Sequence, residues 1–341
     1  MTRNRSHIFM KEFIVCLLAL LSVTLLACNR DRPDREVTIP DFNFPETLTF
    51  EQNLSAYDIF EGDAADLIPA SDFHLLELSS ILFTDYAHKQ RLVKVPTGTK
   101  MTRLSDGSLD YPDGTILTKT FYYQNDERDA NLGRRIIETR LLIKESGLWN
   151  IATYLWNPDQ TDATLAMEGS DTQVNWVGSD GRSQSTLYHV PSQNECMTCH
   201  QSNESINLIG PSLRNLNRMV ERDGMDINQL AHLQGVGALN AFDVNQVSQI
   251  VDYNNPSASL SERGRAYLDL NCSHCHNPSG WDYATERQFD FRYETPFAQT
   301  GIEFEKEKIT DALLDGEMPF IGTTLLDQEG VDLVIQYIES L

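Results

Sequence analysis

Apolar and polar residues alternate along several short stretches between residues 56 and 190. The clearest of these stretches, which are rich in β-branched and aromatic residues, are 114–123, 134–144 and 149–156. A period of two is typical of a β-strand with one buried face. Turn-forming sequences such as Ser146-Gly147 separate the stretches. We therefore predict an antiparallel β module, with a sandwich or barrel-like form, over residues 56–190.

Helical periodicity replaces this alternation after Pro191. Near the carboxyl end, four apolar residues follow the spacing i, i+3, i+4 and i+7 of one helical stripe; they are Val331, Val334, Ile335 and Ile338. Further helical stretches are predicted at 212–222, 227–239, 243–253 and 261–271. The whole pattern predicts an α+β protein, in which an N-terminal antiparallel β module precedes a mainly α-helical region.

The N-terminus has a pattern of its own. Three basic residues precede an apolar run at positions 13–27; they are Arg3, Arg5 and Lys11. The run is too short for a comfortable membrane span, so residues 1–27 are predicted to be a signal peptide. Residues 28–55 are polar and contain prolines, and we expect them to form a flexible tether.

The predicted signal ends in Leu25-Leu26-Ala27-Cys28, which resembles the lipobox of bacterial lipoproteins. The resemblance implies that cleavage leaves Cys28 at the N-terminus, with lipid on its sulfur and amine. The protein would then be an exported lipoprotein anchored to a membrane, with the outer membrane or the periplasmic face favoured. Asn29, in place of an aspartate, favours sorting to the outer membrane in a cell envelope with two membranes. A plain secretory signal with an incidental cysteine is the alternative.

The overall composition is that of a folded soluble protein, with 40% hydrophobic and 23% charged residues in a chain of 341. The net charge of −23 is unusual for a chain of this length. Such a charge repels phosphate groups, so it argues against nucleic acid as a ligand. It favours instead a protein partner that has a basic docking patch.

Cysteine is concentrated in two short motifs. Of the six cysteines, Cys16 lies in the signal and Cys28 in the lipobox, and the other four occupy CxxCH sequences at 196–200 and 272–276. This spacing matches c-type haem attachment, because two thiols on one helical turn can form thioethers with the two vinyl groups of one porphyrin. The histidine that follows is placed to reach the iron.

We therefore predict two covalently bound haem c groups. The predicted cofactor-binding residues are Cys196, Cys199 and His200 for the first haem and Cys272, Cys275 and His276 for the second, with His200 and His276 as iron ligands. A zinc site of four thiolates is an alternative, although structural zinc sites usually keep their cysteine pairs closer in sequence. Disulfides within each CxxC pair are another, but they leave the trailing histidines unexplained.

The second iron has a candidate sixth ligand in Met318, which precedes Pro319 and the terminal helix. A thioether favours ferrous iron and would raise the reduction potential; a core methionine is the alternative. The first iron has only tentative candidates, His232 or Met219, with Met225 also between the motifs. His232 equally suits a helix surface, and an open, five-coordinate iron would suit catalysis.

Beyond the predicted signal peptide, four other histidines are not assigned to iron. His274 lies between the two cysteines of its own motif, where it is poorly aimed at its own iron. The histidines of the β module are expected to be hydrogen-bonded structural residues; they are His74, His88 and His189.

The second motif carries a resemblance to a known fold. Residues 263–276 resemble the N-terminal helix of class I cytochromes c, with Gly264 and Leu268 eight and four positions before Cys272. The segment around Met318 and the terminal helix resemble the later part of that fold. The resemblance implies that the terminal helix crosses the helix before the motif.

The chain as a whole resembles an uncharacterised family of exported bacterial proteins that join a β-rich N-terminal region to two C-terminal CxxCH motifs. The resemblance covers residues 55–341, and the segments that carry it include 82–99, 111–121, 138–165, 190–200 and 264–276. It implies a haem protein of unknown activity. We expect a β-rich module at 56–190, a first haem c segment at 191–258 and a second, class I cytochrome c-like haem domain at 259–341.

The preferred function is that of a membrane-anchored dihaem c-type cytochrome, which transfers electrons to or from a redox partner in the bacterial cell envelope. One alternative is a dihaem redox enzyme, peroxidase-like or an oxidoreductase subunit, with one open haem. A further alternative is a surface binding protein with accessory haems. The sequence assigns no catalytic residue, electron donor or acceptor.

Overall fold

The computed structural model describes residues 48–105, 107–202, 205–280, 288–319 and 321–341, which all belong to one unit of the chain, Arg35–Leu341. The predicted signal peptide, the lipid site Cys28 and most of the predicted tether lie outside the described residues. Among the described residues, no helix has the length and apolar character needed to cross a membrane.

A six-stranded antiparallel sheet forms the centre of the structure, in the order β1-β2-β5-β6-β7-β8. Its strands are β1 (His74–Leu75), β2 (His88–Lys94), β5 (Ile116–Gln124), β6 (Arg134–Glu145), β7 (Leu148–Trp156) and β8 (Ala163–Leu165). The three stretches with the clearest alternation in the sequence are therefore the three long strands β5, β6 and β7. A bulge between Phe121 and Tyr122 shifts the register of β5 against β6.

Four two-stranded sheets accompany the large one. They pair β3 (Thr102–Arg103) with β4 (Leu109–Asp110), β9 (Ser170–Val177) with β10 (Ser183–Val190), β11 (Gln201–Ser202) with β12 (Ser205–Ile206), and β13 (Met219–Arg222) with β14 (Met225–Asn228). The β9–β10 hairpin packs against one end of the large sheet, where Trp176 and Tyr188 join a core cluster with Phe121 and Tyr123.

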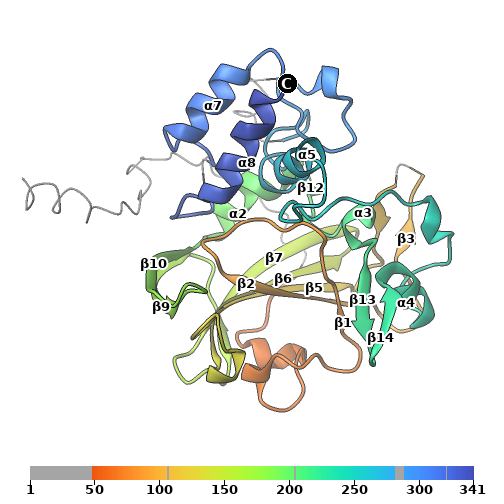
Figure 1. Cartoon of the computed structure of the whole chain (residues 1–341). Helices are drawn as coiled ribbons and strands as arrows, with labels where there is room; N and C mark the ends of the chain where they lie inside the picture. Colours follow the sequence, from red (N-terminus) through yellow and green to blue (C-terminus); the bar gives the residue numbers. More distant parts are fainter. Residues whose placement is uncertain (1–47, 106, 203–204, 281–287, 320) are drawn as a thin grey trace, which may run out of the picture. The chain divides into compact units, whose positions relative to one another are not determined.

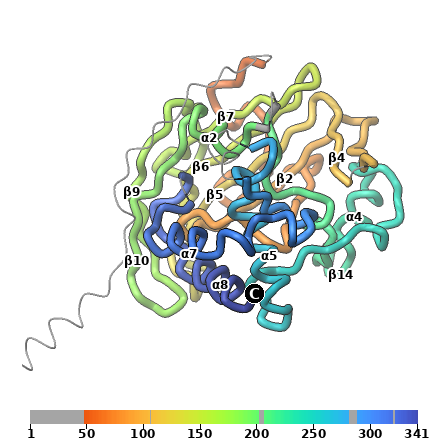
Figure 2. Tube along the Cα trace, turned by 90° about the horizontal axis from the view of Figure 1, so that it is seen from above, coloured from red at the N-terminus to blue at the C-terminus, as the bar shows by residue number. Residues whose placement is uncertain are grey.

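The described helices follow β10 in the sequence. They are α2 (Gln193–His200), α3 (Leu213–Leu216), α4 (Gln229–Gly235), α5 (Leu260–Asn271), α7 (Lys306–Leu314) and α8 (Gln328–Glu339), and the described 3-10 turns are η1 (Leu54–Tyr57), η2 (Ala64–Asp66), η3 (Ala130–Leu132), η4 (Val244–Gln246) and η5 (Phe297–Gln299). Helices α5, α7 and α8 lie on one side of the large sheet, and the segment that contains η1 and η2 lies on the other (Figure 1). The view from above shows the same helices over β2 and β5 (Figure 2).

The prediction of an α+β protein is confirmed, but the form predicted for the β module is wrong. One open sheet with a packed hairpin stands in place of a sandwich or barrel. A second sheet is not needed, because irregular segments and helices bury both faces. One face packs on residues 54–73, and the other on Cys196 of α2 and on α3 and α4.

Two predicted helices are also wrong. Residues 212–222 divide into the short helix α3 and the strand β13, because Asp223-Gly224, both with positive φ, turns the chain into the β13–β14 hairpin. Residues 243–253 form only the 3-10 turn η4, in which the Asp243 side chain accepts a hydrogen bond from Asn245 N. Local side-chain and turn chemistry therefore overrides the apolar spacing in both stretches.

Candidate functional site

The first CxxCH motif forms most of α2. Ser192 caps this helix with a capping box: its Oγ accepts a hydrogen bond from Glu195 N at 3.3 Å, and Ser192 N donates to Glu195 Oε2 at 2.8 Å. Glu195 also bonds to His189 Nε2 of β10 at 3.0 Å. The last strand of the β module therefore holds the start of the helix that carries Cys196, Cys199 and His200.

His200 is held in the orientation of a metal ligand. Its Nδ1 donates a hydrogen bond of 2.8 Å to the Asn207 carbonyl oxygen. Burial lowers the pKa of His200 to about 4, so the imidazole is neutral near pH 7. With the proton on Nδ1, Nε2 keeps its lone pair for a ligand. Histidines that bind metals typically donate their other ring N–H to a carbonyl in this way.

A buried asparagine fixes the loop that follows. The Asn215 side chain accepts a hydrogen bond from Ser80 N and donates to the Ser80 and Gly210 carbonyl oxygens, each at 2.9 Å. Asn215 is fully buried. These bonds connect the segment just after Asn207 to the β module.

The second CxxCH motif begins where α5 ends. Ser259 and Glu262 form a second capping box at the start of α5, and Cys272 is the C-cap residue. The ring of His276 packs against a stacked pair of aromatic rings, with centroid distances of 5.7 Å to Phe289 and 5.2 Å to Phe291. The helix and this apolar contact together position Cys272, Cys275 and His276.

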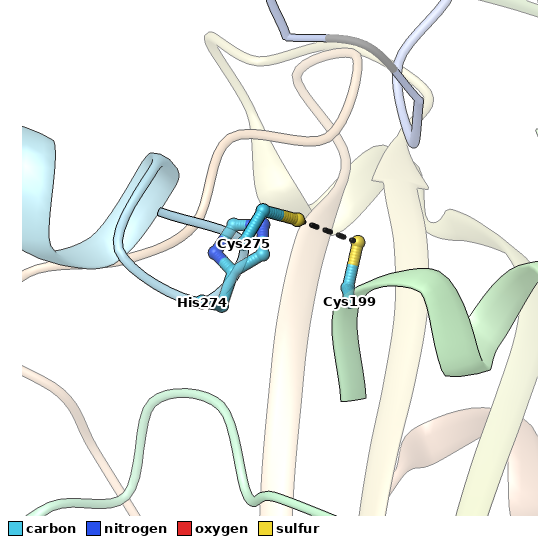
Figure 3. Close-up of side chains that lie close together, drawn as sticks. All are labelled: Cys199, His274 and Cys275. Atoms are coloured by element: carbon cyan, nitrogen blue, oxygen red, sulfur yellow. Dashed lines mark hydrogen bonds between the residues drawn. The ribbon is translucent and has the colours of Figure 1, made fainter. Parts of the chain in front are cut away.

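The fold brings the two motifs into direct contact. Cys275 Sγ lies 3.9 Å from Cys199 Sγ, although the residues are 76 positions apart in sequence. The two thiols point toward each other, with His274 beside Cys275 (Figure 3). Ligand atoms of Cys199, His274 and Cys275 all lie within 4.8 Å of one another, so this trio could also hold a metal ion. A structural zinc site normally has four ligands, and in the described part of the chain the group has three.

All four cysteines of the motifs are free thiols, so the structure contains neither of the CxxC disulfides considered from the sequence. Burial raises the pKa of Cys196 to about 11 and that of Cys272 to about 12. The hydrogen bond from Cys275 to Cys199 raises the pKa of Cys275 and lowers that of Cys199. A free thiol is the form that reacts with a vinyl group to give a thioether, and all four cysteines have this form in the structure.

A large cavity lies between the two motifs. Its walls include all six predicted haem-binding cysteines and histidines, together with Met318, Pro319 and apolar residues of α5, α7 and α8. The cavity has a volume of about 170 Å³. The free thiols, the orientation of His200 and this apolar space all fit c-type haem.

The structure does not bring the other proposed ligands to this cavity. His232 lies in α4 and Met219 in β13, and neither lines the cavity. Met219 and Met225 are exposed, by 58% and 66%. Met318 does line the cavity, and it packs against the same helical core cluster as Cys272.

Two of the three histidines of the β module, His88 and His189, have the hydrogen-bonded structural role that the sequence predicts. His88 Nε2 bonds to Glu127 at 2.9 Å and its ring stacks on Tyr122. His189 bonds to Asp171 and Glu195. His189 also reaches the cavity wall, which the sequence did not indicate.

Sequence reasoning missed a set of cations beside the site. Lys119 and Arg140 line the cavity, and Arg91 is the cross-strand neighbour of Lys119. A signal existed in the alternation, because each of these charges has an apolar residue two places away on at least one side, at Val93, Leu117 and Leu142. Lys119, for example, stands between Leu117 and Phe121.

Comparison of the chain with protein-family models, with curated proteins and with solved structures finds no match.

Proposed function

We propose that this protein is a lipid-anchored c-type cytochrome with two haems, which transfers electrons in the bacterial cell envelope. The observation that carries the proposal is the meeting of two distant CxxCH motifs around one apolar cavity. Each motif offers two free thiols and one histidine. Bound haem c would supply one-electron chemistry between ferrous and ferric iron.

The chain's own residues have distinct tasks in this function. Cys196 and Cys199 would hold one porphyrin, with the Nε2 atom of His200 directed to its iron by the bond to Asn207. Cys272, Cys275 and His276 would hold the other porphyrin. The described part of the C-terminal region, with α5 packed on α8, would form the class I cytochrome c-like domain. The apolar walls from α5, α7 and α8 would exclude water from the iron sites.

Two further parts of the proposal concern the surroundings of the protein. Lipid on Cys28 would anchor it to the outer membrane or the periplasmic face. The net charge of −23 would attract a redox partner with a basic docking patch, so the association rate should fall as salt increases.

The proposal is tested with Met318, which lines the cavity. Protein matured in a host competent for cytochrome assembly is expected to contain two covalent haems by pyridine haemochrome count and mass. Met318→Ala should leave that count unchanged and lower the reduction potential of one haem, because a thioether ligand stabilises ferrous iron. The matched control is Met219→Ala, which changes an exposed methionine outside the cavity.

Colourless protein with an unmodified mass would contradict the proposed cofactor. If the spectra and potentials of both haems are the same in Met318→Ala as in the wild type, Met318 is not an iron ligand. The proposal of two covalent haems would still stand.

A dihaem redox enzyme is the second candidate. It is favoured by one observation, which is that His232 and Met219 both lie away from the cavity. An open position at the first iron would suit reaction with peroxide or another small oxidant. A high-spin band in the oxidised spectrum that changes on addition of peroxide supports the enzyme, whereas two low-spin haems that do not react support the electron carrier.

A further inference from the structure

Three cations form a row across the face of the large sheet that looks toward the motifs. Arg91 of β2 pairs with Lys119 of β5, and Lys119 pairs in turn with Arg140 of β6. Directly paired residues of neighbouring antiparallel strands point to the same side of the sheet, with Cβ atoms about 5 Å apart. The same face is apolar one step along the strands, at Val93, Leu117 and Leu142 in a core cluster.

Two of the three cations, Arg91 and Lys119, have no anionic partner in the part of the chain that the structure describes. Arg91 is only 9% exposed and its Nε has no hydrogen-bond partner. Across the described residues, no carboxylate forms an ion pair with Arg91 or Lys119, which are absent from every ion pair found there. Lys119 has an aromatic contact instead, with its Nζ 4.9 Å from the Phe121 ring centroid.

The nearest buried carboxylate is already used. Glu138 accepts two hydrogen bonds from Arg140, at 2.6 and 2.8 Å, and a third from the Tyr188 hydroxyl at 2.7 Å. Glu138 is fully buried. It therefore balances Arg140 and leaves the charges of Arg91 and Lys119 without compensation.

This arrangement is costly for the protein alone. Like charges placed directly opposite each other in a sheet are destabilising, and a buried charge needs a partner. Burial lowers the pKa of Arg91 to about 10, and burial with the neighbouring Arg91 and Arg140 lowers that of Lys119. Within the described residues, Arg91 and Lys119 lack a carboxylate partner although the chain has a net charge of −23, and a negative group supplied from outside the chain would balance them.

The row also borders space that a ligand can enter. Arg91, Lys119 and Arg140 line a cavity of about 50 Å³ whose wall includes His200. Lys119, Arg140 and His200 line the large cavity between the motifs as well. One water needs roughly 10–15 Å³ by this measure, so the smaller cavity has room for a group the size of a carboxylate.

We propose that Arg91, Lys119 and Arg140 form a buried binding site for a carboxylate or a similar oxyanion. Two sources have this chemistry. One is a propionate group of the haem attached at Cys196 and Cys199, and this source rests on the proposed function. The other is a free small anion that enters through the cavity, which would suit a substrate of the alternative redox enzyme.

The experiment compares Arg91→Met and Lys119→Met with wild type in the full matured chain. The matched control is Lys94→Met, which removes a cation from the other face of β2, where Lys94 pairs with Asp72 at 2.6 Å. Lys119→Arg keeps the charge and should behave as wild type. Four quantities are measured: haem content, the reduction potential of each haem, the resonance Raman bands of the propionates, and thermal stability in increasing acetate at constant ionic strength.

A propionate source gives three linked results. Both Met variants shift the propionate bands and lower the potential of one haem, while acetate has no effect on wild type because the site is filled. Loss of one nearby positive charge, at an effective dielectric of about 20, is expected to change the reduction equilibrium of that haem roughly tenfold. That factor equals ~59 mV for one electron.

A free anion source gives a different pattern. Acetate then stabilises wild type and Lys94→Met, and this stabilisation is lost in Arg91→Met and Lys119→Met, with unchanged propionate bands. Either pattern supports the site. The proposed site is overturned if Arg91→Met and Lys119→Met have the same propionate bands and the same response to acetate as Lys94→Met. This holds even if the reduction potential of a haem shifts.

The two proposals can fail separately. Wild type without haem contradicts the proposed function, and the acetate titration of that same protein still decides the cation site. If a Met variant does not fold, the same titration of Lys119→Gln and Arg91→Gln replaces it.

Discussion

His189 illustrates how the partners of one side chain set its charge. It lies between two carboxylates, with Nδ1 2.7 Å from Asp171 Oδ1 of β9 and Nε2 3.0 Å from Glu195 Oε1 of α2. Burial lowers the pKa of His189, but the bonds to Asp171 and Glu195 outweigh burial, so its pKa is raised from 6.5. The imidazole therefore links the β9–β10 hairpin to the helix of the first motif, and its two carboxylate partners favour the protonated form.

This raised pKa predicts a pH-dependent stability. A raised pKa in the folded state means that the contribution of His189 is fully present below pH 6.5 and is lost as pH rises through the folded-state value. Urea unfolding of wild type and His189→Gln from about pH 5 to about pH 8 should show a gap that narrows as pH rises. Asp171→Asn should weaken the same dependence. A gap that is constant or widens with pH contradicts the prediction.

At the scale of elements, α5 and α8 pack through two reciprocal glycine–tyrosine contacts. A Cβ atom on Gly264 of α5 would lie 2.5 Å from Cγ of Tyr337, and one on Gly330 of α8 would overlap the ring of Tyr267. Both tyrosines are buried in the helical core. The Tyr267 hydroxyl also donates to Asp327, the N-cap residue of α8, at 2.9 Å. The expected contact of the terminal helix with the helix before the second motif is therefore present.

Gly264→Ala tests how closely these helices must approach. The added methyl group forces the Tyr337 ring and the helix axes apart, so we expect a loss of about 1–3 kcal/mol in the free energy of unfolding. Gly235→Ala is the control, because no atom lies within 4 Å of the added Cβ and the backbone is not left-handed. Chemical denaturation of the wild type, Gly264→Ala and Gly235→Ala measures the free energy of unfolding of each protein. Equal stability of the two variants contradicts the argument that α5 and α8 must pack this closely.

At the scale of the molecule, Asp85 joins segments that are far apart in sequence. Its buried carboxylate accepts hydrogen bonds from Thr324 N and Oγ1 and from Leu325 N, at 2.8–3.0 Å, across 239 and 240 positions. Leu325 packs against the core cluster under the β9–β10 hairpin. The chain after Met318 is thus attached to the β module rather than to the helices alone.

Asp85→Asn is expected to weaken this attachment. Asparagine tolerates the positive φ of 49° at this position, so the backbone is preserved, but one acceptor oxygen replaces two. A lost hydrogen bond to a buried charged group predicts a decrease of about 1–3 kcal/mol in the free energy of unfolding. Urea unfolding measures the decrease, and faster amide exchange at Thr324 and Leu325 locates it.

Asp113→Asn provides the comparison, because exposed Asp113 accepts a single bond from Gly147 N. A decrease of the same size in both variants would mean that Asp85 has no special part in holding the two regions together.

The local charge beside the cavity has the opposite sign to the net charge of the molecule. The whole chain has a net charge of −23, yet the sheet face beside the cavity carries Arg91, Lys119 and Arg140, of which Glu138 pairs with Arg140. An average over the sequence cannot reveal such a local reversal, because it depends on the register of three strands. The strands were predictable, but their pairing was not.

The sequence alone was sufficient to predict features whose physical cause lies within a few neighbouring residues. The three long strands followed from alternation over eight or more residues, and the terminal helix from its apolar stripe, since both patterns reflect one buried face. The two CxxCH motifs needed no structure either, because the chemistry of each lies within five consecutive residues. The Asp223-Gly224 turn was equally local, and missing it led to the wrong helix over 212–222.

Only the tertiary structure decided how these parts meet. The contact of Cys199 with Cys275, the exclusion of His232 and Met219 from the cavity, and the row through Lys119 all join residues that are distant along the chain. Such contacts depend on strand register and on the packing of helices over a sheet. Both result from the burial of many side chains at once, and no single stretch of sequence contains that information.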